Sequence, residues 1–450
     1  MTDLIAARSQ MAMSLGFHII FAAIGIALPL MMAIAEWRWL RTGKTIYLIL
    51  AKRWAKGSAI LFAVGAMSGT VLSFELGLLW PAFMGWAGEI IGLLFSLEGF
   101  AFFAEAIFLG IYLYGWQRVP PKAHWAAGIL VAASGAASAV FVVMVNAWMN
   151  TPAGFRLVDG RPTEIDHLAV MLNPSALGEV VHMLLAAYAA TGLLVCGIHA
   201  FLLLRDSRNQ FHRAAFRIAL AVGGVAAILQ PLSGDLLAKT VAHYQPVKLA
   251  AFEAQFKTEP AAPLRIGGIP DTVRREVRGA LEIPGGLSVL LYLDRHAVVT
   301  GLDAVPREDW PPVGIVHLAF QVMVAAGFAM ALVGLWGMWL WWRRGELFGS
   351  TTFLRAAVAV SPLGFIAIEA GWVVTEVGRQ PWIISKIMRT ADAVTPMPGL
   401  LYPLVTFTVL YLLLAAVVVW LIMRHIAASA DRSSDEMVEA ESPPRSVRGG

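Results

Sequence analysis

The sequence predicts an all-α polytopic membrane protein with about nine transmembrane helices, its N-terminus outside and its C-terminus in the cytoplasm. Hydrophobic residues make up 58% of the 450 residues and charged residues only 14%, against roughly 25% in soluble domains. The mean hydropathy is +0.69. The apolar residues gather in stretches of about 20, the length that an α-helix needs to cross a bilayer. The single cysteine, Cys196, excludes a disulfide framework and a thiolate metal cluster.

Each predicted span is an apolar stretch bounded by polar segments. The first begins near Met11, is too long for the core of a signal peptide and has no basic segment before it, so we expect it to be retained. Gly and Pro inside several spans are tolerated when neighbouring helices supply hydrogen-bond partners for the backbone N–H and C=O groups that they leave unpaired. In chain order the spans cover residues 13–36, 58–80, 92–115, 125–148, 178–204, 214–236, 313–342, 354–377 and 399–423.

The charges of the short loops predict the orientation, because cytoplasmic loops of membrane proteins are rich in Lys and Arg. The second loop, Pro81 to Ile91, has neither residue, and the odd-numbered loops hold most of them. The eighth loop is an exception, since Arg379, Lys386 and Arg389 fall on the outer side and need another role. The basic residues of the odd-numbered loops are Arg38, Arg41, Lys44, Lys52, Arg53, Lys56, Arg118, Lys122, Arg205, Arg208, Arg213, Arg343 and Arg344.

The spans divide the chain into four segments without an internal repeat. Residues 1–236 form a six-span N-terminal bundle, and residues 313–426 form a three-span C-terminal bundle. Residues 237–312, rich in Pro, Gly and charges, are predicted to be a folded extracytoplasmic loop. The polar residues 427–450 are predicted to be a disordered cytoplasmic tail.

Ionisable side chains inside the spans are costly in hydrocarbon and usually functional. Any one of them can instead be a helix-end residue that bonds a neighbouring helix. For His199 and His317, which lie near span ends, we keep that structural interpretation. The full set is His18, Glu75, Glu98, Glu105, His182, His199, His317, Glu369 and Glu376.

Four potential metal ligands, His18, His182, Met323 and Glu376, fall in the outer half of the predicted bilayer. Imidazole and thioether groups are axial ligands of haem iron, and a His/Met pair makes a low-spin electron-transfer haem. Met323 alone, one of 18 methionines, is more simply explained by packing. The four together suggest a redox enzyme that holds haem.

Glu98 and Glu105 are seven residues apart, so they lie two turns apart on one face of the third span. Such a pair of carboxyls, with Ser134 and Ser138 on the fourth span, can line a proton route through the membrane. The alternative is two carboxylates that face a polar interior of the bundle.

Several of these residues lie in longer strings that resemble one family. GWVVTEVGRQPW (371–382) matches the GWxxxExGRQPW motif of the cytochrome bd quinol oxidase family, subunit I. LNPSALGEVVHMLLAAY (172–188) and LAFQVMVAAGF (318–328) resemble the segments that supply the low-spin haem ligands. VKLAAFEAQF (247–256) resembles the core of the quinol loop, and EGFAFFAEAIFLG (98–110) the acidic third helix. The similarity covers residues 8 to 425 with the same nine-span plan.

The resemblance implies which residues hold the cofactors. His182 and Met323 would be the axial ligands of a low-spin haem b. His18 and Glu376 would each bind one of the two haems of the oxygen site, a high-spin haem b and either haem d or a further haem b. It also implies roles for Lys248 and Glu253 in quinol oxidation, Glu98 and Glu105 in the proton path, Arg379 beside a haem propionate, and Asn146 and Trp372 near the haems.

The resemblance further implies an electrogenic terminal oxidase of the bacterial inner membrane. It would oxidise quinol, ubiquinol by expectation, at the outer face and reduce O2 to water with protons taken from the cytoplasm. The family works with a second membrane subunit and often with a small single-span subunit, and no nucleic acid partner is implied. Gln321 stands where many members have Arg, and the outer loop is short, as in the cyanide-insensitive branch.

Two other classes of function stay open at the level of the sequence. A secondary transporter would use midplane carboxylates to bind its substrate, but it predicts inverted repeats and broken helices. A haem-containing electron carrier that does not reduce oxygen would share the same ligands. Haem absorption separates the first class from an oxidase, and quinol-driven oxygen uptake separates the second.

Overall fold

The computed structural model describes residues 2–345 and 347–441. Within these residues nine helical segments are long and apolar enough to cross a membrane, which confirms the predicted fold class and number of spans. They are α1 (Asp3–Thr42), α2 (Thr45–Leu79), α3 (Pro81–Tyr114), α4 (Pro121–Asn150), α6 (Ala176–Arg205), α7 (Gln210–Tyr244), α10 (Val313–Arg344), the pair α11 (Thr351–Val360) and α12 (Leu363–Val377), and α14 (Leu401–Glu441).

Most of these helices are longer than the predicted spans, because capping residues outside the apolar core set their ends. The Thr2 side chain accepts a hydrogen bond from Ile5 N at the start of α1, and the helix ends at Gly43 in the left-handed region. The eighth span is broken at Ser361 and Pro362, where proline has no N–H to donate to the preceding turn.

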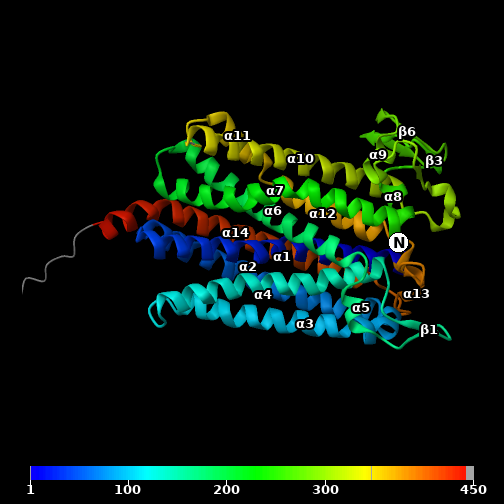
Figure 1. The fold of residues 1–450 in the computed structure, drawn as a ribbon. Coiled ribbons are helices and arrows are strands. Elements are labelled where there is room, and N and C mark those ends of the chain that lie inside the picture. Colours follow the sequence, from blue (N-terminus) through cyan, green and yellow to red (C-terminus); the bar gives the residue numbers. More distant parts are fainter. Residues whose placement is uncertain (1, 346, 442–450) are drawn as a thin grey trace, which may run out of the picture.

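The helices form one bundle in which the C-terminal spans lie among the N-terminal ones (Figure 1). α6 and α10 each pack against both α7 and α12, so these four helices form a group with α6 and α10 on opposite sides. α1 packs against α2, α4, α6 and α14, and α3 packs mainly against α4. This arrangement brings residues 3–244 and 313–441 into shared interfaces.

The long loop between α7 and α10 is a folded cap that begins after Tyr244 and leads into α10. Its strands pair only as short antiparallel two-stranded ladders, β3 with β8, β4 with β7 and β5 with β6. Its elements are α8 (Pro246–Phe252), β3 (Glu259–Pro260), β4 (Leu264–Ile266), β5 (Ile269–Asp271), β6 (Glu276–Arg278), β7 (Leu281–Ile283), α9 (Gly286–Tyr292), β8 (Val298–Val299), η1 (Leu302–Ala304) and η2 (Arg307–Asp309).

The N-terminus and the other structured loops lie at the same end of the bundle as the cap (Figure 1). We call this end the cap end. The loop before α6 holds β1 (Arg156–Val158), β2 (Arg161–Thr163) and α5 (His167–Met171). The loop before α14 holds β9 (Trp382–Ile384), β10 (Met388–Arg389) and α13 (Thr390–Ala393).

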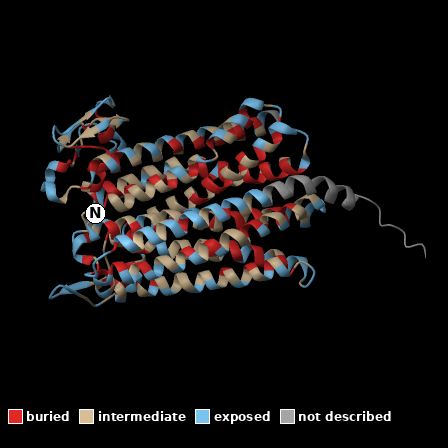
Figure 2. Ribbon diagram, turned by 180° about the vertical axis from the view of Figure 1, so that it is seen from behind, coloured by how far each residue is buried: buried red, intermediate tan, exposed pale blue. Residues whose placement is uncertain are grey.

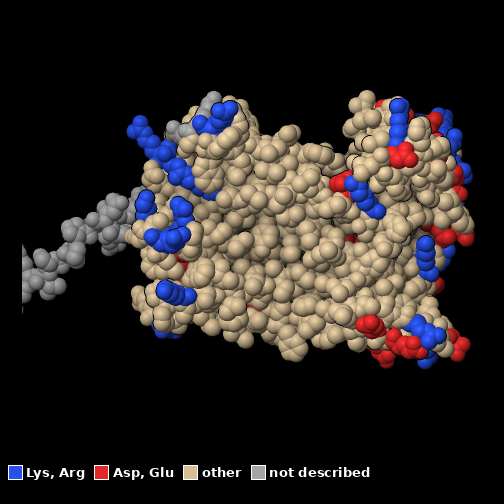
Figure 3. Space-filling view, in the orientation of Figure 1, with Lys and Arg blue, Asp and Glu red and all other residues tan. Residues whose placement is uncertain are grey.

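The two ends of the bundle differ in charge (Figure 3). The end opposite the cap shows mainly Lys and Arg, the cap end shows both signs, and the surface between them is almost free of charge in this view. Figure 2 shows buried residues concentrated on the inner helices. This pattern fits a protein with a lipid-facing belt. We call the end opposite the cap the basic end.

α14 continues to Glu441, so residues 427–441 have helical backbone where the sequence predicted a disordered tail. Their composition explains the difference, because a polar segment that follows a helix without Pro or Gly can continue it. The remaining residues of the predicted tail, 442–450, lie outside the described residues.

Candidate functional site

A closed ring of four polar side chains lies where α4 meets the end of α12. Glu376 accepts hydrogen bonds from Asn146 Nδ2 and, at 2.5 Å, from Arg379 Nη2. Arg379 Nη1 donates to Asn150 Oδ1 at 3.3 Å, and Asn150 Nδ2 donates to Asn146 Oδ1 at 3.1 Å. Arg379 is only 5% exposed, so the adjacent carboxylate offsets the cost of burying its charge.

Asn150 also connects this ring to Lys248 and Glu179. Its Oδ1 accepts from Lys248 Nζ at 2.6 Å, and its Nδ2 donates to Glu179 Oε1 at 3.1 Å. Burial, and then the nearby Arg379, lower the pKa of Lys248 from its ordinary 10.5 to about 7. Two basic side chains, Lys248 and Arg379, and one carboxyl group, Glu179, therefore bond to the Asn150 amide, and the cap contributes Lys248 to this cluster.

The two candidate histidine ligands have the same arrangement of partners. His18 Nδ1 lies 2.9 Å from Ser68 Oγ, and His182 Nδ1 lies 2.9 Å from Ser233 Oγ. Each serine hydroxyl donates its only hydrogen to a carbonyl of its own helix, Val64 in one case and Gln230 in the other. The serine oxygens must therefore accept from Nδ1–H, which leaves the lone pair of each imidazole on Nε2.

A glycine follows each of these serines and makes room for the imidazole ring. A Cβ atom on Gly69 would lie 3.0 Å from His18 Cε1, and one on Gly234 would lie 3.3 Å from His182 Cε1. A Ser-Gly pair on another helix thus positions each histidine, and we call the pairs Ser68-Gly69 and Ser233-Gly234 the two Ser-Gly seats. A histidine that donates from Nδ1 and keeps its lone pair on Nε2 is the form that binds a metal. At His182 the side-chain amide of Gln230, whose Nε2 lies 3.1 Å from His182 Nε2, has to turn away before a metal can bind.

Met323 lies on α10 and His182 on α6, on opposite sides of the four-helix group. Gly371 of α12 packs against the thioether, because a Cβ atom there would lie 3.1 Å from Met323 Sδ. The positions of the two side chains suit the two faces of a planar group between α7 and α12. The structure does not bring the two side chains into direct contact.

The donor set fits haem. Imidazole and thioether groups are axial ligands of haem iron, and the Glu376 carboxylate adds an anionic oxygen donor. Gly69, Gly234 and Gly371 lie beside the two imidazoles and the thioether. Each oxygen of Glu376 accepts one hydrogen bond, from Asn146 or from Arg379, and keeps a second lone pair that a metal could use. Among the described atoms, the buried Trp372 Nε1 has no hydrogen-bond partner, and it lies on the same helix as Glu376.

Glu98 and Glu105 both face α4, as their spacing predicts. Ser138 Oγ donates to Glu98 Oε1 at 3.3 Å, and a Cβ atom on Gly135 would lie 3.2 Å from the Glu105 carboxyl. Ser134 contributes less than expected, because its hydroxyl donates to carbonyls of its own helix. Ser138 and Gly135 of α4 are therefore the residues that face Glu98 and Glu105 of α3.

Glu253 lies at the end of α8, on the inner side of the cap, and is only 3% exposed. Burial raises the pKa of Glu253 from its ordinary 4.5 to about 8, and the nearby Arg265 opposes this rise. Its Oε2 makes no hydrogen bond to any described residue. A buried carboxyl that is largely protonated near neutral pH is suited to exchange protons with a bound molecule.

Gln321 joins the cap to the helix that carries Met323. Its Oε1 accepts from Gly267 N at 2.9 Å, and its Nε2 donates to Arg265 O at 3.2 Å. One turn earlier, the buried His317 Nδ1 donates to Phe252 O at 2.8 Å. Gln321 thus makes two hydrogen bonds to the cap backbone, and the hydrogen bond of His317 to Phe252 O supports the structural role that the sequence indicated.

The other in-span ionisable groups lie outside this site. Glu75 accepts a hydrogen bond from Gln10 Nε2 at 2.9 Å. Glu369 lies against Gly16 of α1, where a Cβ atom would be 3.0 Å from its Oε2. His199 Nδ1 lies 3.0 Å from His212 Nδ1 near the basic end, which supports a structural interpretation of His199.

Two of the three basic residues of the eighth loop, Arg379 and Arg389, have partners that account for their unexpected side. Arg379 pairs with Glu376, and Arg389 Nη2 pairs with Asp309 Oδ1 of the cap at 2.6 Å. These charges therefore bind acidic groups at the cap end and need not indicate orientation.

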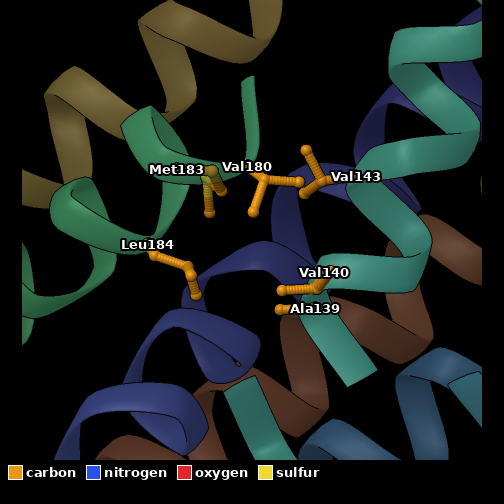
Figure 4. A pocket seen from close by; sticks show the side chains of 6 residues that line it. All are labelled: Ala139, Val140, Val143, Val180, Met183 and Leu184. Atoms are coloured by element: carbon orange, nitrogen blue, oxygen red, sulfur yellow. The ribbon is translucent and has the colours of Figure 1, made fainter. Parts of the chain in front are cut away.

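A small apolar gap between α4 and α6 is too narrow to hold a water molecule (Figure 4). Ala139, Val140, Val143, Val180, Met183 and Leu184 line it. None of these side chains is a donor or acceptor, so we interpret it as a packing gap.

Sequence reasoning missed Glu179, Asn150, Ser68 and Ser233. Helical spacing would have found two of them, because Glu179 lies one turn before His182 and Asn150 one turn after Asn146. The repeated Ser-Gly pair at 68–69 and 233–234 was the available indication for the serines. Their partners, however, come from other helices.

Comparisons with known proteins agree along the whole chain. Residues 6–430 match the family described as cytochrome bd terminal oxidase subunit I. The chain is 38% identical to the putative cytochrome bd menaquinol oxidase subunit I of Bacillus subtilis, covering 94% of this chain and 97% of the relative. It is 33% identical to the cytochrome bd ubiquinol oxidase subunit 1 of the same organism, covering 99% and 98%. The solved structure of bd oxidase from Geobacillus thermodenitrificans matches with a TM-score of 0.88 and 40% identity, covering 95% of this chain and 99% of that chain.

Proposed function

Because this chain belongs to the family of cytochrome bd terminal oxidase subunit I, we propose that it is the haem-bearing catalytic subunit of a respiratory quinol oxidase. Family membership confirms the resemblance inferred from residues 371–382. It makes the protein a multi-span membrane oxidoreductase. The curated relatives are named for menaquinol or ubiquinol, and we propose ubiquinol as the first substrate to test. We propose the bacterial inner membrane as its location and a second membrane subunit as its partner.

The two Ser-Gly seats are the observation that carries this proposal. They contact Nδ1 of His18 and of His182, which leaves the lone pair of each imidazole on Nε2, and Met323 lies opposite His182 in the four-helix group. We assign His182 and Met323 to a low-spin haem b. We assign His18 and Glu376 to the oxygen site, which holds a high-spin haem b with haem d or a further haem b. When bound, these haems supply electron transfer and oxygen reduction.

Quinol is proposed to bind at residues 245–312, between the cap and the bundle. Glu253 and Lys248 lie on the inner side of the cap, and both have pKa values that burial brings close to neutrality. Either group can therefore take up a proton from a quinol hydroxyl near neutral pH. The hydrogen bonds of Gln321 with Gly267 N and Arg265 O hold the cap against the helix that carries Met323.

Protons for water formation are proposed to come from the basic end through Glu105 and then Glu98. All proposed ligands lie in the half of the bundle nearer the cap, so these protons must cross the other half. Replacing Glu105 by Gln removes one carboxyl of the route and should lower turnover by about 100-fold. Glu89→Gln is the matched control, because Glu89 lies on the exposed surface of the same helix. Wild-type turnover in Glu105→Gln would exclude this route.

The function is tested on the oxidase purified with its partner subunit. Reduced-minus-oxidised spectra with haem extraction should show a low-spin haem b together with high-spin haem. Oxygen uptake should depend on added quinol, with ubiquinol and menaquinol tested in parallel, with and without cyanide. A preparation that contains haem but takes up no oxygen with either quinol would contradict the proposal and indicate an electron carrier.

A further inference from the structure

A buried polar cluster lies at the basic end, where α1, α3 and α4 meet, far from the ligands and the cap. Glu36 of α1, Tyr112 of α3 and His124 of α4 are 1%, 0% and 2% exposed. His124 Nδ1 lies 2.8 Å from Glu36 Oε1, and His124 Nε2 lies 2.9 Å from the Tyr112 carbonyl oxygen. The assigned function does not use any of these three residues.

The geometry of His124 requires a proton shared with Glu36. A carbonyl oxygen only accepts hydrogen bonds, so Nε2 must carry the hydrogen that faces the Tyr112 carbonyl. The short contact between Nδ1 and Glu36 Oε1 then needs a second hydrogen, held by either the imidazole or the carboxyl. The pair therefore stores one proton that can lie on either side of this bond.

Two oxygens of the cluster remain available for hydrogen bonding. The second Glu36 oxygen, Oε2, and the Tyr112 hydroxyl are buried, and neither is bonded to another described residue. The Tyr112 hydroxyl nevertheless interacts electrostatically with Glu36. Leaving a buried polar group without a hydrogen bond destabilises the folded state, which is unfavourable for a purely structural anchor. Buried sites with several such groups are where proteins hold internal water.

Tyr112 continues the row formed by Glu98 and Glu105. The three residues are spaced by seven along α3, so each lies two turns, about 10 Å, from the next on one helix face. The opposing helix has the same spacing. A Cβ atom on Gly128 would lie 2.6 Å from the Tyr112 ring, and one on Gly135 would lie 3.2 Å from the Glu105 carboxyl.

The cluster also has a connection toward the surface of the basic end. The Trp116 ring, in the loop after α3, lies 3.9 Å from the His124 ring. Lys52, which is exposed, places its Nζ 5.3 Å from the Trp116 ring. Only one half-buried aromatic layer thus separates the Glu36–His124 pair from the solvent side.

From this placement we propose that Glu36, His124 and Tyr112 form the entrance of the proton route that leads to Glu105. A proton from the basic end joins the Glu36–His124 pair, and the proton already stored there moves to the Tyr112 oxygen. Tyr112 releases its own hydroxyl proton toward Glu105, so each group returns to its starting state when the next proton arrives. In a helix each Cα–Cβ bond tilts toward the helix N-terminus, and Glu105 lies in that direction from Tyr112 along α3. This inference rests on the proposed function, in which Glu105 carries protons.

Tyr112→Phe is the decisive variant, because it removes only a hydroxyl and leaves the ring that packs against Trp116 and His124. Turnover of the purified oxidase with quinol and oxygen should fall about tenfold or more. The solvent deuterium isotope effect should rise, while the haem spectrum and the anaerobic rate of haem reduction by quinol stay unchanged. If Tyr112 had only a structural role, the haem spectrum and the anaerobic rate of haem reduction would change together with turnover.

Tyr47→Phe is the matched control. Tyr47 lies near the same end, and its hydroxyl accepts a hydrogen bond from Arg38 Nη2 at 3.2 Å outside the row. If Tyr112→Phe does not assemble, Glu36→Gln replaces it, since Gln keeps the shape of the side chain and carries the same expectation. Loss of haem in both variants would show a structural cluster and overturn the proposal.

The test also distinguishes this proposal from the function on which it rests. Slow turnover in Glu105→Gln with wild-type turnover and isotope effect in Tyr112→Phe would place the entrance elsewhere and leave the route intact. Wild-type turnover in both variants would overturn the route itself.

Discussion

Ser68 and Ser233 show how a neighbouring hydroxyl determines the chemistry of a histidine. Each serine has one hydrogen, and a backbone carbonyl of its own helix takes it. The oxygen can then only accept, so the imidazole must present its hydrogen at Nδ1 and its lone pair at Nε2. A single buried hydroxyl thereby selects the tautomer that binds a metal.

Ser233→Ala should weaken the low-spin haem without unfolding the helix. Removing a group that orients a metal-binding histidine typically costs 10–100-fold in metal affinity, so we expect substoichiometric haem and an altered midpoint potential. Haem content and redox titration measure both. Ser73→Ala is the control, because Ser73 is exposed on α2 and bonds only its own helix. Equal haem content and potential in the two variants would contradict the orienting role.

Glu253 should make the stability of the cap depend on pH. The folded state keeps the proton on this carboxyl up to a pKa of about 8, whereas the unfolded chain releases it above its ordinary 4.5. The folded state then binds more protons than the unfolded state, so stability falls as pH rises through this window. The loss amounts to several kcal/mol at most, since one pKa unit corresponds to about 1.4 kcal/mol. The thermal unfolding temperature of the wild type should decline from pH 5 to 9, and that of Glu253→Gln should not. Parallel curves for the two proteins would contradict a role of Glu253 in the pH dependence of stability.

At the scale of elements, α10 connects the cap to the ligand set. Met323 faces α12, while Gln321, two residues earlier, bonds the backbone between β4 and β5. One helix thus positions a candidate ligand and the cap together. At this position the chain has a neutral amide that bonds the cap directly.

Gln321→Ala should loosen the cap around Gly267. Two hydrogen bonds are lost, each worth about 0.5–1.5 kcal/mol, so the free energy of local opening should fall by about 1–3 kcal/mol. Faster amide hydrogen exchange in residues 264–283 and a higher KM for quinol are the expected results. Val322→Ala, at a position that is 47% exposed on the same helix, is the control. Unchanged exchange in this segment would mean that His317 and the strands hold the cap alone.

For the molecule as a whole, the charge difference between its ends predicts the orientation in the membrane. The basic end should face the cytoplasm and the cap should face outward. This single-cysteine chain is suited to a labelling test, because Cys196 is only 1% exposed. A membrane-impermeant maleimide should label Val273→Cys in the cap of intact cells, and Gln117→Cys at the basic end only after cell disruption. The reverse pattern would invert the topology and with it the proposed direction of proton uptake.

The sequence by itself determined the nine spans, the shared end of the N-terminus and the long loop, the family and the facing of Glu98 and Glu105 toward one neighbour. These properties depend on apolar length, loop order and helical spacing, which are local to the chain. The tertiary structure decided the rest, because those contacts join distant residues. Only folding brings Asn146 to Glu376, Ser233 to His182 and Glu36 to His124. The available nitrogen of each histidine and the polar cluster beyond Glu105 follow from these pairings, and neither is encoded in any single segment.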